Sequence, residues 1–158
     1  MKKVVWKPYA FWIIITELIG GIAALLIRND TELYRTAVEK PPLAPPGFIF
    51  PIVWTILYAV MAIGMARITI RATPNEKKMC TGIYLAQLTF NFFWSILFFK
   101  ARLFDVAFFW LLALWALILW MIVRFSRADQ PAGLMQIPYL AWVAFAGYLN
   151  LGVWLLNR

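Results

Sequence analysis

The sequence predicts an all-α integral membrane protein, a single domain over residues 1–158 that crosses a bilayer as a bundle of five transmembrane helices. Hydrophobic residues make up 64% of the chain and charged residues 14%, and the mean hydropathy is +0.77. A soluble domain is about half apolar, so this chain has too little polar surface to cover a core in water. Five apolar runs come close to the roughly 20 residues that a helix needs to cross the hydrocarbon layer. Their polarity does not alternate, which excludes barrel strands.

The five runs are separated by charged segments. They cover residues 9–27, 47–66, 79–99, 103–123 and 131–156. The first run follows Lys2, Lys3 and Lys7, as in a signal peptide. Its apolar stretch is longer than a typical signal core, so we interpret it as a retained helix.

The first run has an acid near its middle, Glu17. A carboxyl group inside a membrane is a candidate site for protons or a cationic ligand; the alternative, which we prefer, is a protonated Glu17 hydrogen-bonded to a neighbouring helix. Small residues recur every four positions, as Thr16, Gly20 and Ala24, and Gly21 follows Glu17 at the same spacing. This pattern predicts close contact with another helix or with a second subunit.

The segment 28–46 is the one long connection, and residues 41–46 contain four prolines. Proline removes a backbone donor and fixes φ, so this stretch cannot form a regular helix and favours a stiff, extended path into the second run. Such a connection either holds a shape over the bundle or only spaces two helices, and the sequence leaves both possibilities open.

The net charge of +8 comes from basic residues at the ends of the apolar runs. Headgroups and topology explain that placement, and no motif for nucleic acid accompanies it, so we expect no nucleic-acid partner. The side of the N-terminus carries nine of the fifteen Lys and Arg residues: Lys2, Lys3, Lys7, Arg67, Arg71, Lys77, Lys78, Arg124 and Arg127. The positive-inside rule therefore predicts a cytoplasmic N-terminus, and we expect the membrane to be that of a bacterial cell.

Aromatic and amide residues share helix faces in three of the runs. At helical spacing, these faces comprise Trp54, Tyr58 and Met61; Gln87, Asn91, Trp94 and Phe98; and Tyr139, Trp142, Ala146 and either Leu149 or Asn150. Amides are costly against lipid, so the faces should point into the bundle. An interior of this kind suits a flat aromatic or sterol-like ligand, although such residues can also simply pack against one another.

Common enzyme and metal chemistries find no support in the sequence. The chain has no histidine and a single cysteine, Cys80. This composition excludes His-based acid–base catalysis and the common zinc sites, and we expect no metal site and no required cofactor.

Three segments of the sequence, taken in order, form a recognisable set. Residues 39–58 read EKPPLAPPGFIFPIVWTILY, residues 86–95 read AQLTFNFFWS, and residues 138–150 read PYLAWVAFAGYLN. Together they resemble the TspO/MBR family, the tryptophan-rich sensory proteins related to the translocator protein, or peripheral-type benzodiazepine receptor. The resemblance implies a five-helix bundle, commonly a homodimer. It also implies binding of porphyrins, sterols and benzodiazepine-type ligands in a pocket that the first loop closes.

Carried over by position, the resemblance implies a ligand site whose walls largely coincide with the faces described above. With Tyr58 added from its helix face, the predicted site residues are Tyr34, Pro45, Trp54, Tyr58, Asn91, Trp94, Trp142, Ala146 and Leu149. Trp54 and Trp142 match the pair proposed to act in light-dependent porphyrin degradation. Two departures are Leu33, where many members have Trp, and Leu151, which occupies the position of a Tyr in the cholesterol-recognition pattern of animal proteins. Sterol binding through that pattern is therefore not expected.

These observations predict a membrane protein that binds tetrapyrroles (porphyrins) and has a sensory or stress-regulatory role, with the porphyrin as ligand rather than cofactor. Its propionates could meet Arg28, Arg35 or Lys40 in the long loop. A small transporter of porphyrin, sterol or another hydrophobic ligand is the alternative, indicated by Glu17 and the amides within the runs. An assembly scaffold is a third possibility.

Overall fold

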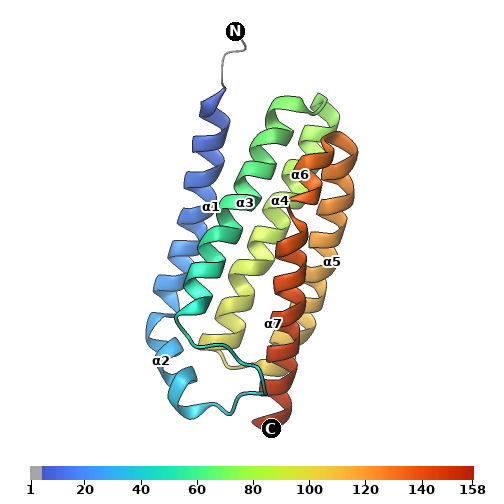
Figure 1. Cartoon of the computed structure of the whole chain (residues 1–158). Coiled ribbons are helices and arrows are strands. Elements are labelled where there is room, and N and C mark those ends of the chain that lie inside the picture. Colours follow the sequence, from blue (N-terminus) through green and yellow to red (C-terminus); the bar gives the residue numbers. More distant parts are fainter. Residues whose placement is uncertain (1–4) are drawn as a thin grey trace.

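Five long helices stand side by side in the computed structural model, which describes residues 5–158 (Figure 1). They are α1 (Trp6–Leu26), α3 (Ile49–Arg71), α4 (Pro74–Ser95) with its π-helical continuation η1 (Ile96–Lys100), α5 (Phe104–Ala128) and α7 (Ile137–Leu156). Two shorter helices, α2 (Arg28–Ala37) and α6 (Gln130–Leu134), complete the chain. The predicted class is confirmed, because five spans are long and apolar enough to cross a membrane and residues 5–158 contain no strand.

The helices extend beyond the apolar runs that predict them. The second helix continues to Arg71 rather than ending at residue 66, and the third begins at Pro74 rather than at residue 79. The start of α4 is fixed by a capping box, in which the Glu76 N–H donates to Thr73 Oγ1 at 3.4 Å and the Thr73 N–H donates to Glu76 Oε2 at 3.1 Å. Charged residues therefore end the apolar run here but not the helix.

The last span is not the single helix expected over residues 131–156. It begins as the short α6, turns at Met135 and Gln136, and continues as α7. Gly133 explains the tight approach of α6 to α5, since a Cβ on it would overlap the hydroxyl of Ser126. Pro138 stands at the start of α7, where its missing N–H costs nothing.

The long connection between the first two spans contains a helix that the sequence analysis missed. Residues 28–37 form α2, which carries many charged residues and lies below α1 at one end of the bundle (Figure 1). Residues 38–48 then follow an irregular path, as the prolines predict. We call residues 38–48 the strap. The connection holds a defined shape and does not merely space two helices.

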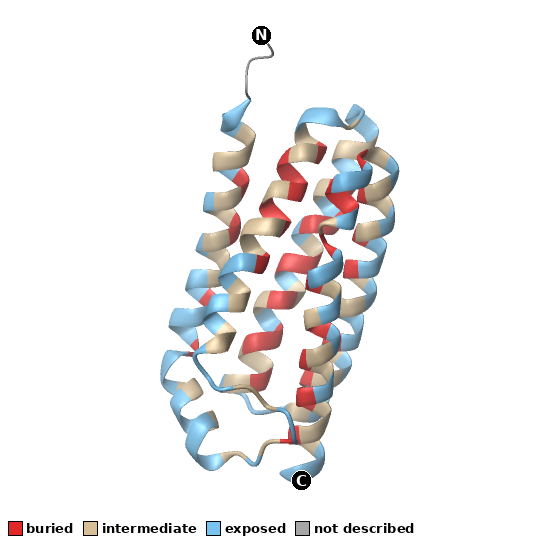
Figure 2. Cartoon of the chain, in the orientation of Figure 1, coloured by how far each residue is buried: buried red, intermediate tan, exposed pale blue. Residues whose placement is uncertain are grey.

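Buried residues face the bundle axis, and large apolar residues cover the outside (Figure 2). Helix α1 is the least enclosed span, with Trp12, Thr16 and Ala23 as its buried residues. The Trp12 indole donates to Thr69 Oγ1 at 2.8 Å, and the Thr16 and Tyr84 hydroxyls share a hydrogen bond of 2.6 Å. These polar contacts join α1 to α3 and α4 within the hydrocarbon layer.

The preferred interpretation of Glu17 is wrong in one respect. Within residues 5–158, no hydrogen bond from a neighbouring helix reaches its carboxyl group, which lies with Ile14 and Leu18 in a shallow groove on the outer side of α1. The small-residue pattern divides between two faces. Gly20 contacts the Tyr58 ring inside the bundle, whereas Gly21 has open space where a Cβ would be.

The connections between the helices divide between the two ends of the bundle. The start of α1 and the α3–α4 and α5–α6 connections lie at one end, and α2, the strap and the end of α7 lie at the other (Figure 1). The segments that the charge count assigned to the side of the N-terminus therefore do lie at one end. Lys2 and Lys3, which belong to that count, lie outside the described residues. Which end faces the cytoplasm stays a prediction.

An ion pair at the first of these ends joins α3 to the break before α6. The Arg67 guanidinium donates to both carboxylate oxygens of Asp129, at 2.6 and 3.2 Å. Asp129 is 9% exposed and also accepts a bond from the Ala132 N–H, at 3.3 Å. Arg71 lies 3.8 Å from the same carboxylate but is 59% exposed. The bidentate geometry assigns most of the stabilisation to Arg67.

We expect Arg67→Gln to lower the free energy of unfolding by about 2 kcal/mol, because it leaves the buried Asp129 carboxylate without its main partner. The matched variant Arg71→Gln should cost less than about 0.5 kcal/mol, because its contact is long and exposed. Denaturant unfolding in detergent micelles measures both. Equal losses in the two variants would contradict this division.

Candidate ligand-binding pocket

A cavity of about 670 Å³ opens inside the bundle beneath α2 and the strap. Helices α1, α3, α4 and α7 form its walls, and η1 closes one corner. All nine predicted site residues line this one cavity: Tyr34, Pro45, Trp54, Tyr58, Asn91, Trp94, Trp142, Ala146 and Leu149. Their shared location is a fact of the structure, and their role in binding stays a prediction.

Indole rings from three helices form the apolar walls. Trp54 of α3 lies 5.5 Å from Tyr58 and 6.5 Å from Trp94 of α4, measured between ring centroids. Across the cavity, Trp142 of α7 meets Phe50 at 5.9 Å. The Trp142 indole N–H is buried and has no hydrogen-bond partner among residues 5–158. These walls offer flat faces for stacking and one unused donor.

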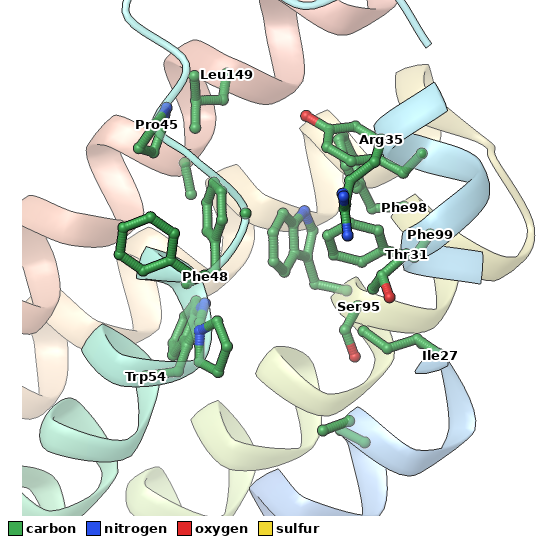
Figure 3. Close-up of a pocket in the computed structure, with 18 of the residues that line it drawn as sticks. Ile27, Thr31, Arg35, Pro45, Phe48, Trp54, Ser95, Phe98, Phe99 and Leu149 are labelled. Atoms are coloured by element: carbon green, nitrogen blue, oxygen red, sulfur yellow. The ribbon is translucent and has the colours of Figure 1, made fainter. Parts of the chain in front are cut away.

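The π-helical turn brings two adjacent phenylalanines to the same corner of the pocket (Figure 3). The Ala101 N–H donates to the Ile96 carbonyl at 2.9 Å, the wider spacing of a π turn. Tyr34 of α2 then meets the rings of Phe98 and Phe99 at 5.4 and 5.3 Å. Helical spacing placed Phe98 on the predicted face but not Phe99. No pattern in the local sequence predicts the π turn.

Tyr34 joins α2 to the rest of the pocket. Its ring packs against Phe98 and Phe99, and burial raises the pKa of Tyr34 to about 12. The phenol therefore stays neutral throughout the physiological pH range and acts as an aromatic wall.

Hydrogen-bonded amides form the floor. The Tyr58 hydroxyl donates to Asn91 Oδ1 at 3.0 Å, and Asn91 Nδ2 donates in turn to the Tyr139 hydroxyl at 2.8 Å. Trp94 Nε1 donates to Asn150 Oδ1 at 3.1 Å. Asn150 and Tyr139 lie behind the lining, so Leu149 is the residue of α7 that reaches the cavity at this level.

Basic residues surround the mouth of the cavity. Arg28, Arg35 and Lys40 line it together with one acid, Glu32. Arg35 pairs with Glu32 at 3.1 Å and reaches towards the cavity from α2 (Figure 3). The Lys40 ammonium donates to the Arg35 carbonyl at 2.9 Å and lies 5.2 Å from the centre of the Tyr34 ring. The excess of positive charge favours an anionic group on a ligand.

The strap is attached to α7 at three points. The Asn157 side chain forms a two-bond pair with the Glu39 backbone, accepting from its N–H at 3.0 Å and donating to its carbonyl at 2.9 Å. The Tyr148 hydroxyl donates to the Pro42 carbonyl at 2.7 Å. Pro41 is buried on Gly152, where any Cβ would overlap the proline ring. Nothing in the sequence predicts these contacts.

No group of three or more His, Cys, Asp or Glu side chains that could hold an ion exists within residues 5–158. The thiol of Cys80 is buried in α4, away from the pocket lining.

The fold and the cavity define the class of protein: a five-helix membrane protein with an aromatic internal pocket under a basic mouth. The sequence profile described as the TspO/MBR family matches residues 12–155, so the chain belongs to the TspO/MBR family.

Similar proteins are known from bacteria and animals. The chain is 35% identical to the tryptophan-rich protein TspO of Chlorobaculum tepidum over 145 residues, covering 88% of this chain and 89% of that protein. It is 30% identical to the translocator protein of Bos taurus over 155 residues, covering 97% and 92%. It is also 34% identical to protein CrtK of Rhodobacter capsulatus over 122 residues, covering 77% and 76%. The family and these names support a sensory or ligand-binding role in a membrane.

We expect Asn157→Ala to raise the amide exchange rate of Glu39 about fivefold to tenfold, because its N–H loses a hydrogen-bond acceptor. Hydrogen-exchange mass spectrometry of the strap peptide measures this. Asn157→Asp is the matched control, since it keeps the acceptor oxygen while removing the donor to the Glu39 carbonyl. Protection lost equally in both variants would contradict a role for the acceptor.

Proposed function

We propose that this protein binds a tetrapyrrole in its internal pocket and acts as a membrane sensory or stress-regulatory protein. The main support for the proposal is that one cavity of about 670 Å³ has both flat aromatic walls and a basic mouth. Three tryptophans, Trp54, Trp94 and Trp142, supply flat walls, and basic side chains surround the mouth. A porphyrin has the matching chemistry, a flat apolar macrocycle with carboxylates on one edge.

The proposed pose follows from these two features. The macrocycle stacks on Trp54 and Trp142, where aromatic faces contribute roughly 1 kcal/mol each beyond the burial of their area. The propionates point outward to Arg28, Arg35 or Lys40, which form charge-assisted hydrogen bonds with them. Leu33, which replaces the Trp common in the family, is absent from the lining, so the pose does not depend on it.

Light-dependent porphyrin degradation belongs to the same proposal. An excited porphyrin held against Trp54 and Trp142 can take an electron from an indole and pass it to dioxygen, which gives superoxide. The indole radical cation then takes an electron from the macrocycle and is restored, and superoxide adds to the oxidised macrocycle, so dioxygen is the oxidant overall. The reaction needs no resident cofactor, because the ligand itself absorbs the light.

Transport receives less support from the same residues. Asn91 and Asn150, which indicated a polar path, are both engaged in hydrogen bonds with neighbouring side chains or backbone. Glu17 lies on the outer side of α1. Transport, the homodimer implied by the resemblance, and a bacterial membrane with a cytoplasmic N-terminus stay predictions.

We expect the double variant Trp54→Ala, Trp142→Ala to weaken protoporphyrin binding about 30-fold, because two aromatic contacts of roughly 1 kcal/mol each are lost. The affinity is measured by titration with fluorescence quenching. The matched control is Trp6→Ala, Trp120→Ala, which removes the same number of fluorophores from positions that are 64% and 50% exposed. An unchanged protoporphyrin affinity in the Trp54→Ala, Trp142→Ala variant would contradict the assignment of this cavity as the binding site.

Under illumination in air, the wild-type protein should consume bound protoporphyrin, and the variant Trp54→Phe, Trp142→Phe should do so at least about tenfold more slowly. Phenylalanine keeps an aromatic wall but is a far poorer electron donor than indole. The loss of porphyrin absorbance at saturating protein measures the rate. Equal rates in the two proteins would remove the degradation step and leave the binding proposal intact.

A further inference from the structure

A chain of hydrogen bonds runs from the pocket floor into the centre of the bundle. It begins at Tyr58, passes through Asn91, Tyr139 and Gln87, and ends at Met61. The Tyr139 hydroxyl donates to Gln87 Oε1 at 2.7 Å, and Gln87 Nε2 donates to Met61 Sδ at 3.7 Å. The last three residues are fully buried, and none of them lines the pocket.

The end of the chain at Met61 sets the direction of every bond in it. A thioether sulfur has no hydrogen to give, so the Gln87 amide turns its NH₂ group towards Met61 and its oxygen towards Tyr139. The Tyr139 hydroxyl must then donate to that oxygen and accept from its other neighbour, the Asn91 NH₂ group. All donors therefore point away from the pocket and towards Met61.

The consequence appears at the pocket surface. Because Asn91 presents its amide oxygen to Tyr58, the hydroxyl hydrogen of Tyr58 is committed to that bond. No donor within residues 5–158 gives a hydrogen bond to the Tyr58 oxygen. Tyr58 lines the cavity, and a ligand that reaches its hydroxyl oxygen meets an acceptor and not a donor.

We propose that Met61, acting through Gln87, Tyr139 and Asn91, makes Tyr58 a selector for flat ligands that carry an N–H or O–H donor. Met61, Gln87 and Tyr139 are positioning residues, since they lie behind the lining. Bonds aligned in one direction also polarise one another, which strengthens the acceptor at the pocket end. The inference rests on the proposed function, because it requires that the pocket bind a flat ligand.

Carbazole and dibenzofuran test the selection, because these tricyclic probes have nearly the same shape and differ by an N–H in place of an oxygen. Wild-type protein should bind carbazole about fivefold more tightly, the usual worth of one added hydrogen bond. Both probes dissolve in detergent, so binding is taken as the signal above that of the Trp54→Ala, Trp142→Ala variant.

The decisive variant is Met61→Leu, which keeps the volume of the side chain but removes the sulfur. With no acceptor at its end, the chain has two directions of similar energy, and the preference for carbazole should fall to less than about twofold. Met65→Leu is the matched control: Met65 is equally buried one turn further along α3, and its side chain has no hydrogen bond among residues 5–158. It should keep the fivefold preference.

The outcomes separate this inference from the function on which it rests. If protoporphyrin binds wild-type protein but carbazole and dibenzofuran bind equally, the selection is overturned and the pocket assignment stands. A preference that survives Met61→Leu overturns the role of the sulfur. If protoporphyrin does not bind at all, the proposed function falls, and this inference falls with it.

Discussion

Lipid provides no hydrogen-bond partners, and this constraint governs the interior of the bundle. An amide or hydroxyl placed inside a span needs a partner, because an unpaired polar group in hydrocarbon costs several kcal/mol. The hydroxyls of Thr55 and Thr89 find one on their own helix, whereas the amides reach across to another. Asn91 and Gln87 meet Tyr139 across the axis, Asn150 meets Trp94, and Thr16 meets Tyr84. These bonds fix how α1, α4 and α7 are rotated and hence which side chains face the cavity.

The same constraint explains why much of the site could be predicted from the sequence. An amide in a long apolar run points inward, and its neighbours one turn away point inward with it. The faces of α4 and α7 therefore follow from Asn91 and Asn150, once the runs are recognised as helices, whereas α3 has no amide and its face follows from the spacing of its aromatic residues. The family resemblance added Tyr34 and Pro45, which lie in the connection where periodicity gives no information.

The features that the sequence did not predict depend on contacts between distant segments. The π turn at Phe98 and Phe99 is stabilised by packing against α2, and the break before α7 depends on Gly133 meeting α5. Hydropathy reports where a helix leaves the lipid, but not where its backbone stops or changes its winding. The outward placement of Glu17 could not be foreseen for the same reason, because it depends on how α1 is rotated against α3.

The contact between Asn157 and the strap joins the last turn of α7 to the segment between α1 and α3. The strap covers the cavity, and Asn157, which helps to set its register over the opening, forms no part of the cavity wall. Force applied to the last turn of α7, from a fused domain or a bound neighbour, is therefore transmitted to the cover of the cavity. The mechanical state of that turn and the accessibility of the interior are linked through the contacts of Asn157, Tyr148 and Gly152 with the strap.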